Sequence, residues 1–133
     1  MSTKSGVVGP GADRTEVYRA GPRIVLTVRG YHHGQAARDA IAYFHMLMSE
    51  STTAVEVVAD LRNITGFDED CRLLWQDGLR SYTDHIKMIT LIQGTPLAKM
   101  AASALGLYLG IQVRSVEGLA DPDSPEELRA QHK

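Results

Sequence analysis

The stretch "DLRNITGFDEDCRLLW", residues 60–75, decides how the chain is interpreted. An apolar segment ends at Asp60 and Leu61, a turn is expected next, and the acids Asp68, Glu69 and Asp70 open an amphipathic helix. Acids in a first helical turn complement the helix dipole, and aspartate is a favoured N-cap, so we expect Asp68 to cap this helix. Catalysis, metal binding and docking of a partner are the other roles that such a turn could serve.

Outward from this stretch, β-favouring and helical patterns alternate. Strand-like segments are "TEVYRAG" and "RIVLTVRG" before it, "TAVEVVADL" leading into it, and "KMITLIQG" and "IQVRSVE" after it. Helical periodicity covers 34–48, 68–86 and 95–109, and a capping box in "DSPEELRA" predicts a short terminal helix. Thr95 as N-cap, Pro96 at the first helical position and Gly110 after the end delimit the third helix.

This order predicts an α/β fold. Strands that alternate with helices imply right-handed crossovers, and hence a mostly parallel sheet of about five strands with covered faces and an initial hairpin. We expect a flexible N-terminal arm over 1–13, one domain over 14–120, and a short C-terminal helix or tail over 121–133.

Composition excludes several classes of function. The net charge is −2 and the basic residues are scattered, so no nucleic-acid-binding patch is expected. No apolar run approaches the ~20 residues that span a bilayer, so no stable membrane insertion is expected. The single cysteine, Cys71, indicates a reducing cytoplasm and is interpreted as a small buried apolar residue. Metal-ligand spacing is absent, and neither a metal nor a cofactor is expected.

The stretch resembles the STAS domain of anti-anti-sigma factors, whose pattern is Asp-Leu, a few residues, then Asp-Ser-Ser/Thr-Gly-Leu. Asp60 and Leu61 match the Asp-Leu and Asp68 matches the later Asp, while Asp70 falls on the phosphorylated Ser/Thr. In "VRGYHH", Gly30 matches the family's loop before the first helix. The resemblance implies a STAS-like fold and a non-enzymatic protein-interaction module in bacterial signalling, with a kinase-like or regulatory protein as partner.

The chain departs from that pattern at position 70. Aspartate has no hydroxyl to phosphorylate, so we expect a docking surface fixed in one electrostatic state. A homo-oligomer is also compatible with the sequence. We expect the docking rim at Asp60, Thr65, Gly66, Asp68, Glu69, Asp70 and Leu73. Leu73 projects away from the apolar face of its helix, as Met46 does on the preceding helix, and the two together are a candidate partner patch.

Two alternatives remain open. The first is a Sec14-like carrier of a lipid or small hydrophobic ligand, which requires an apolar cavity beneath the helix over 95–109 or the first helix. The second is a small enzyme in which His33 and Asp68 or Asp70 form an acid–base pair. His33 and Thr95 form the candidate polar rim of such sites, because Thr95 opens a helix whose amides could hold an anion.

Overall fold

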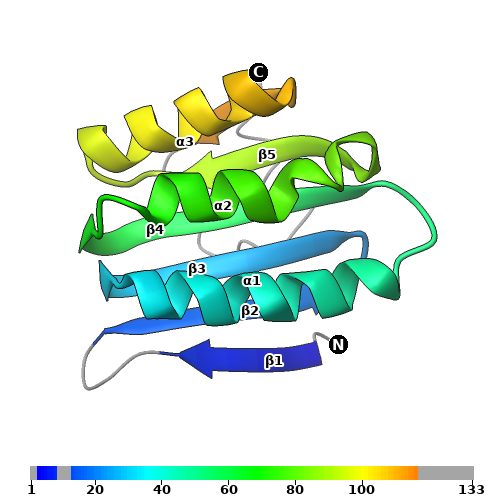
Figure 1. Ribbon diagram of the computed structural model, residues 1–133, viewed down its shortest axis with the longest axis horizontal. Helices are drawn as coiled ribbons and strands as arrows, with labels where there is room; N and C mark the ends of the chain where they lie inside the picture. The colour runs from blue at the N-terminus through cyan, green and yellow to red at the C-terminus, as the bar shows by residue number, and fades with distance from the viewer. Residues whose placement is uncertain (1–2, 9–12, 117–133) are drawn as a thin grey trace.

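The computed structural model describes residues 3–8 and 13–116. These residues form one six-stranded sheet and three α-helices (Figure 1). The elements in chain order are β1 (Thr3–Val8), β2 (Arg14–Ala20), β3 (Arg23–His32), α1 (Gly34–Ser49), β4 (Val55–Phe67), α2 (Cys71–Arg80), a 3₁₀ helix (Thr83–His85), β5 (Ile86–Ile92), α3 (Pro96–Leu109) and β6 (Val113–Val116).

The strands lie in the sheet in their sequence order, β1-β2-β3-β4-β5-β6. β1, β2 and β3 pair antiparallel, and β3 to β6 pair parallel. Gly21 adopts φ 61° in the tight β2–β3 turn, a conformation that glycine reaches without strain. The predicted hairpin, the five predicted strands and the mostly parallel sheet are therefore confirmed.

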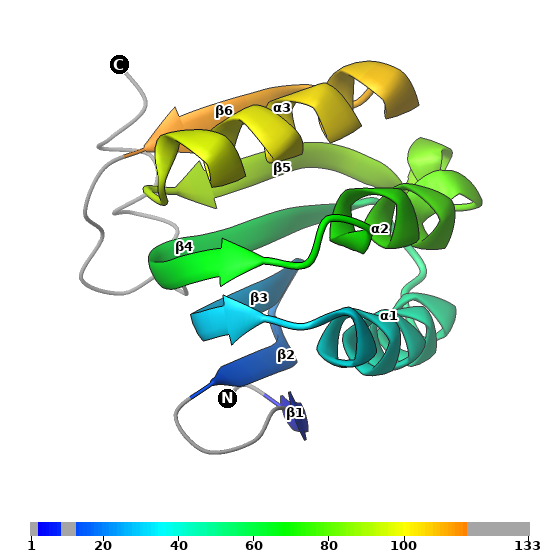
Figure 2. The same cartoon turned by 60° about the vertical axis from the view of Figure 1, so that its left-hand side comes forward.

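Contrary to the predicted covering of both faces, α1, α2 and α3 all lie on the same face (Figure 2). The reason is the strand order. Each parallel connection is a right-handed crossover to the next strand in the same direction, and such crossovers place every helix on one side. On the other face, among the described residues, no helix packs.

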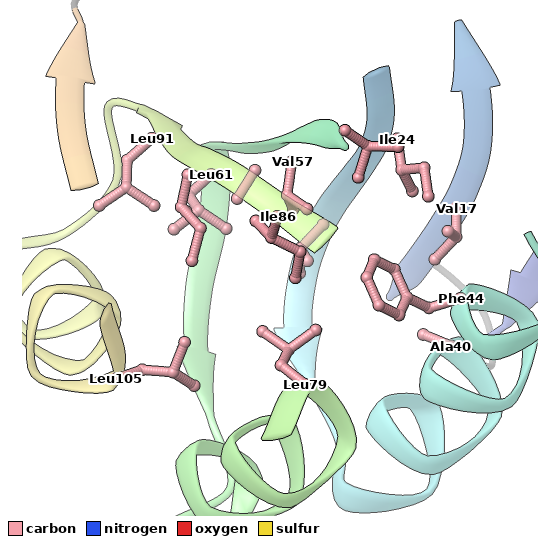
Figure 3. Close-up of a cluster of buried hydrophobic side chains, with 14 of the residues drawn as sticks. Val17, Ile24, Ala40, Phe44, Val57, Leu61, Leu79, Ile86, Leu91 and Leu105 are labelled. Carbon is pink, nitrogen blue, oxygen red and sulfur yellow. The ribbon is translucent and has the colours of Figure 1, made fainter. Parts of the chain in front are cut away.

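The main core lies between this row of helices and the sheet. Phe44 of α1, Leu79 of α2 and Leu105 of α3 point toward the sheet residues Val57 and Leu91 (Figure 3). Alternate residues of β4, from Val55 to Leu61, supply the sheet side, as the period of two in a strand requires. Position 78 requires glycine because α1 and α2 approach closely there. A Cβ on residue 78 would lie 2.7 Å from the side chain of Ile41.

Three predicted boundaries are wrong. β4 does not stop at Leu61 but continues through Thr65 and Gly66 to Phe67, paired with β3 as far as His32. The second helix starts at Cys71 and ends at Arg80. Residues 3–8, expected to be part of a flexible arm, form β1, and the predicted C-terminal helix or tail over 121–133 lies outside the described residues.

The face without helices carries a buried ionic network. Glu56 of β4 accepts hydrogen bonds from Arg23 Nε at 3.1 Å, Arg114 Nη2 at 3.0 Å and Thr90 Oγ1 at 2.5 Å. Burial alone would raise the pKa of Glu56, but the hydrogen bonds from Thr90, Arg23 and Arg114 outweigh it and lower the pKa. β3, β4, β5 and β6 are thus joined through one carboxylate.

We predict that Glu56→Gln destabilises the protein by about 3–5 kcal/mol, because it leaves the guanidinium groups of Arg23 and Arg114 without their buried countercharge. A lowered pKa means that the carboxylate stabilises the fold above about pH 4.5 and ceases to do so as the pH falls through the folded-state pKa. Urea unfolding at several pH values measures both effects. Glu50→Gln, at an exposed position, is the control, and equal stability of the two variants at pH 7 would contradict the prediction.

Candidate functional site

The candidate site lies where β3 and β4 end and α1 and α2 begin. Ligand and partner sites of open α/β sheets gather at such carboxyl ends of strands. His32 and Phe67 are the last paired residues of β3 and β4. The backbone N–H of Asp68 donates to the carbonyl of His32 at 3.0 Å, which holds the acidic turn against the start of α1.

Asp68 caps the neighbouring helix and not its own, which corrects the predicted cap. Its Oδ2 accepts a hydrogen bond from the backbone N–H of Gly34, the first residue of α1, at 2.6 Å. This bond is the main cause of the lowered pKa of Asp68, and a hydrogen bond from the Tyr31 hydroxyl adds to it. The same bond from Tyr31 raises the pKa of that phenol. The reversal follows from the extended β4, which continues to Phe67 beside His32 and so brings Asp68 to the start of α1.

Asp70 also faces α1. A Cβ on Gly34 would lie 3.4 Å from oxygens of both Asp68 and Asp70, and Asp70 Oδ2 lies 3.7 Å from Arg38 Nη2. Asp70 makes no side-chain cap of α2. Both partners of this ion pair are about half exposed, so it contributes little to stability. Glu69, by contrast, is exposed and points to solvent with no described partner, so it and Asp70 present negative charge on the surface.

His33 pairs with Asp13 and not with the acids of the turn. His33 Nε2 lies 2.7 Å from Asp13 Oδ2, and Asp13 Oδ1 accepts from the Tyr31 N–H at 3.0 Å. The Tyr31 N–H and then His33 lower the pKa of Asp13. The predicted pairing of His33 with Asp68 or Asp70 is therefore replaced by a loop-bracing contact with the residue before β2.

Three residues of the predicted rim lie elsewhere or serve the strand. Asp60 points to the face without helices, is 6% exposed, and is bound by Arg62 through Nε at 3.0 Å and Nη2 at 2.8 Å. Thr65 and Gly66 belong to β4, and Gly66 is small because the Tyr31 ring lies 3.1 Å from where its Cβ would be. Asp60 is thus separated from the acids that the structure brings together.

Leu73 is 51% exposed in the first turn of α2, as its predicted orientation requires. Met46 is 45% exposed in the last turn of α1. Because His45 of α1 lies opposite Gly78 of α2, Leu73 is five residues, or about 7.5 Å, further along the helix pair. The two side chains are therefore offset by more than one helical turn, and the joint patch of Leu73 and Met46 stays a prediction.

Thr95 caps α3 as predicted. Its hydroxyl oxygen accepts a hydrogen bond from the N–H of Ala98 at 3.1 Å. The cap occupies the hydroxyl with a helix amide, and Thr95 lies at the end of β5, apart from His33. β4 lies between β3, which precedes His33, and β5, which precedes Thr95, and a joint polar rim of the two residues stays a prediction.

Beneath the acidic turn lies a buried polar chain that the sequence did not indicate. Trp75 Nε1 donates to His32 Nε2 at 3.1 Å, so the other ring nitrogen of His32 carries the proton and donates to Thr15 Oγ1 at 3.0 Å. Burial, and then His33, lower the pKa of His32 to about 4. The ring is therefore neutral at pH 7. As the pH falls below 6.5 the unfolded chain binds a proton there that the folded chain does not, and folding weakens.

Cys71 is buried, as predicted, and its thiol donates to the His32 carbonyl at 3.4 Å. Burial is the main cause that raises the pKa of this thiol to about 11. The thiol is therefore protonated at neutral pH and is a poor nucleophile.

An apolar cavity of about 130 Å³ lies between the sheet and the three helices. His32, Cys71 and Trp75 line it at the site end, and Ala98, Ala101 and Ala102 of α3 line it at the other. An apolar cavity of roughly 150 Å³ in another protein binds benzene, so the volume of this one is comparable to that of a single ring.

Within the described part of the chain, no group of three or more His, Cys, Asp or Glu could hold a metal ion. No described helix is long and apolar enough to cross a membrane.

No family model matches the sequence, and no curated protein matches it. A solved structure does match: an uncharacterized protein of the DUF3478 family from Shewanella loihica PV-4, described as having a SpoIIAA-like fold. The TM-score is 0.60 at 9% sequence identity, over 98% of this chain and 93% of that one. The fold is SpoIIAA-like. The likeness confirms the predicted STAS-like fold and, at this identity, shows the fold alone.

Besides the chain of Trp75, His32 and Thr15, sequence reasoning missed Asp13, Tyr31 and Arg38, which hold the acidic turn and the loop before α1. The sequence did not indicate a role for Arg38, because an arginine one turn into a helix looks like any solvent-exposed charged residue. Asp13 fell in a segment without periodicity.

We predict that Asp68→Asn lowers the thermal stability at pH 7 more than Glu69→Gln does, because only Asp68 caps α1. The pKa of Asp68 is lowered in the folded state, so its carboxylate stabilises the fold above about pH 3.8 and loses this effect as the pH falls further. Thermal unfolding followed by circular dichroism between pH 3 and 7 measures the difference. A gap between the two variants that does not narrow on acidification would show that the cap is not the cause.

Proposed function

We propose that this protein is a non-enzymatic protein-interaction module of bacterial signalling that acts in the cytoplasm. The observation that carries the proposal is the exposed acidic turn at the start of α2 in a SpoIIAA-like fold. In the STAS domains that the sequence resembles, the residue at this place is a phosphorylated Ser/Thr on a docking surface. Here the position is Asp70, a permanent carboxylate.

The contacts divide the acids of the turn by role. The Asp68 carboxylate accepts hydrogen bonds from Gly34 and Tyr31 within the protein. Glu69, by contrast, is exposed, and Asp70 is about half exposed. Arg38 offsets only part of this charge, so the turn suits a partner surface that carries Lys or Arg. Leu73, one turn further along α2, is exposed and supplies an apolar contact beside the charge.

Because residue 70 has no hydroxyl to phosphorylate, the charge of the proposed docking surface does not change. A phosphate would add about one further negative charge and acceptor oxygens at a helix N-terminus. Asp70 keeps one charge at all times and is held toward Arg38. The partner would therefore be bound without a phosphorylation step at this position.

We predict that Asp70→Lys and Leu73→Asp each reduce partner binding at least tenfold, because they reverse the charge and remove the apolar contact of the rim. The measurement is crosslinking and capture of the tagged protein in its own cells, followed by mass spectrometry. Met46→Asp, at a similarly exposed apolar position on α1, is the matched control. Equal recovery of the same partner by all four proteins would remove the acidic turn from the function.

A second function is favoured by the cavity: binding of a small apolar ligand. The cavity is lined by apolar side chains from β2 to β5 and all three helices, with the polar edge of His32 and Trp75 at one end. Its volume of about 130 Å³ limits the ligand to roughly the size of a single ring. Carriage of a whole lipid would require a rearrangement of the helices.

We predict that benzene or indole raises the thermal stability of the parent protein, because a ligand that binds only the folded state stabilises it. Ala102→Phe, which projects a ring into the cavity, abolishes this effect, whereas Ala42→Phe on the exposed side of α1 retains it. Native mass spectrometry of protein isolated from its own cells would reveal a resident ligand. No stabilisation of the parent by any ring-sized ligand would contradict this second function.

A further inference from the structure

The outward face of α3 carries a row of large apolar side chains that the proposed function does not use. Leu97 is 64% exposed, Met100 66%, Leu107 85% and Tyr108 58%. Single exposed apolar residues are common, but a contiguous row on one helix is not. α3 lies at the end of the row of helices, beside β5 and β6, so no other described element covers its outer side (Figures 1 and 2).

The spacing of this row is that of a helix–helix seam. Leu97, Met100, Ala104 and Leu107 are separated by three, four and three residues, the a–d–a–d spacing of a coiled coil. All four are exposed, while Ala98, Ala102 and Leu105 on the opposite side face the cavity and the sheet. We call Leu97, Met100, Ala104 and Leu107 the α3 seam.

The α3 seam is complementary to itself. About a twofold axis at the level of position 102, an antiparallel copy brings Leu97 opposite Leu107 and Met100 opposite Ala104. A large side chain thus meets a small one at the centre, and two leucines meet at each end. Isologous interfaces require this self-complementarity, because the same surface patch serves both subunits.

Charge supports a second copy over other occupants. Lys99 is the only charged residue of α3, and it lies off the seam, so two copies approach without repulsion. A membrane-bound helix would carry several Lys or Arg beside its apolar face. Arg80 forms a polar rim on the α2 side: its Nη2 lies 2.9 Å from Asp77 Oδ1 and 3.3 Å from the Tyr108 hydroxyl.

We propose that the α3 seam is a homodimer interface in which the α3 helices of two copies pack antiparallel. A seam of about three helical turns lies at the small end of specific interfaces, below about 1,200 Å² in total. The dimer is therefore expected to dissociate in the micromolar range. The acidic turn of the proposed function lies at the start of α2, outside the seam, so it stays accessible in the dimer.

Sedimentation velocity of the full chain from about 1 µM to several hundred µM tests the proposal. The parent is expected to shift from monomer to dimer with concentration, and Leu107→Asp to remain monomeric at every concentration with unchanged thermal stability. Met46→Asp, exposed on α1, is the control and is expected to dimerise like the parent. A parent that is monomeric throughout, or a dimer that persists in Leu107→Asp, overturns the proposal.

Cysteine crosslinking tests the antiparallel register. Leu97→Cys and Leu107→Cys are prepared separately, and oxidised glutathione is added to each alone and to their mixture. The mixture is expected to form a disulfide-linked heterodimer at least tenfold faster than either variant alone, because position 97 faces 107 of the other copy. Cys71 is buried and does not compete. Faster linkage of either variant with itself would indicate a parallel arrangement and overturn the register.

Discussion

The sequential order of the strands is the constraint on which the rest of the structure depends. Because β3, β4, β5 and β6 succeed one another in one direction, each right-handed crossover places its helix on the same face. This puts α1 and α2 side by side with their N-termini adjacent, which brings Asp68 to Gly34. It also makes α3 the last helix of the row, with an outer side that no described element covers. The acidic site and the α3 seam thus have one topological origin.

Much of this fold follows from the sequence because the local signals agree. The Val-rich alternation in "AVEVVADL", the cap at Thr95 and the tight turn at Gly21 each predict an element that the structure contains. The prediction that helices cover both faces of the sheet was wrong. The sequence pattern identifies a buried strand, but it does not tell what buries each face. Glu56, Val58 and Asp60 of β4 are buried on the face without helices, where Glu56 pairs with two arginines.

The candidate site was less predictable, because its contacts are set by register and not by local pattern. Asp68 looks like an ordinary N-cap of the following helix, and only the continuation of β4 to Phe67 carries it to α1. From the sequence, His33 could pair with any nearby acid. In the structure it pairs with Asp13, because the residue before β2 lies beside the end of β3. The composition of α3 does not tell which of its alanines face the sheet: Ala98 and Ala102 line the cavity, whereas Ala104 is exposed.

The first turns of α2 connect the two proposed functions physically. Cys71 and Trp75 line the cavity, whereas Asp70 and Leu73, from the same turns, lie on the surface. The hydrogen bonds from Cys71 and Asp68 to the carbonyl of His32, and from Trp75 to its ring, hold these turns to the end of β3. Because protein interiors are closely packed, a ligand larger than the cavity must displace α2 or α3. Displacement of α2 would move Asp70 relative to Arg38, so a ligand larger than the cavity would change the shape of the acidic turn.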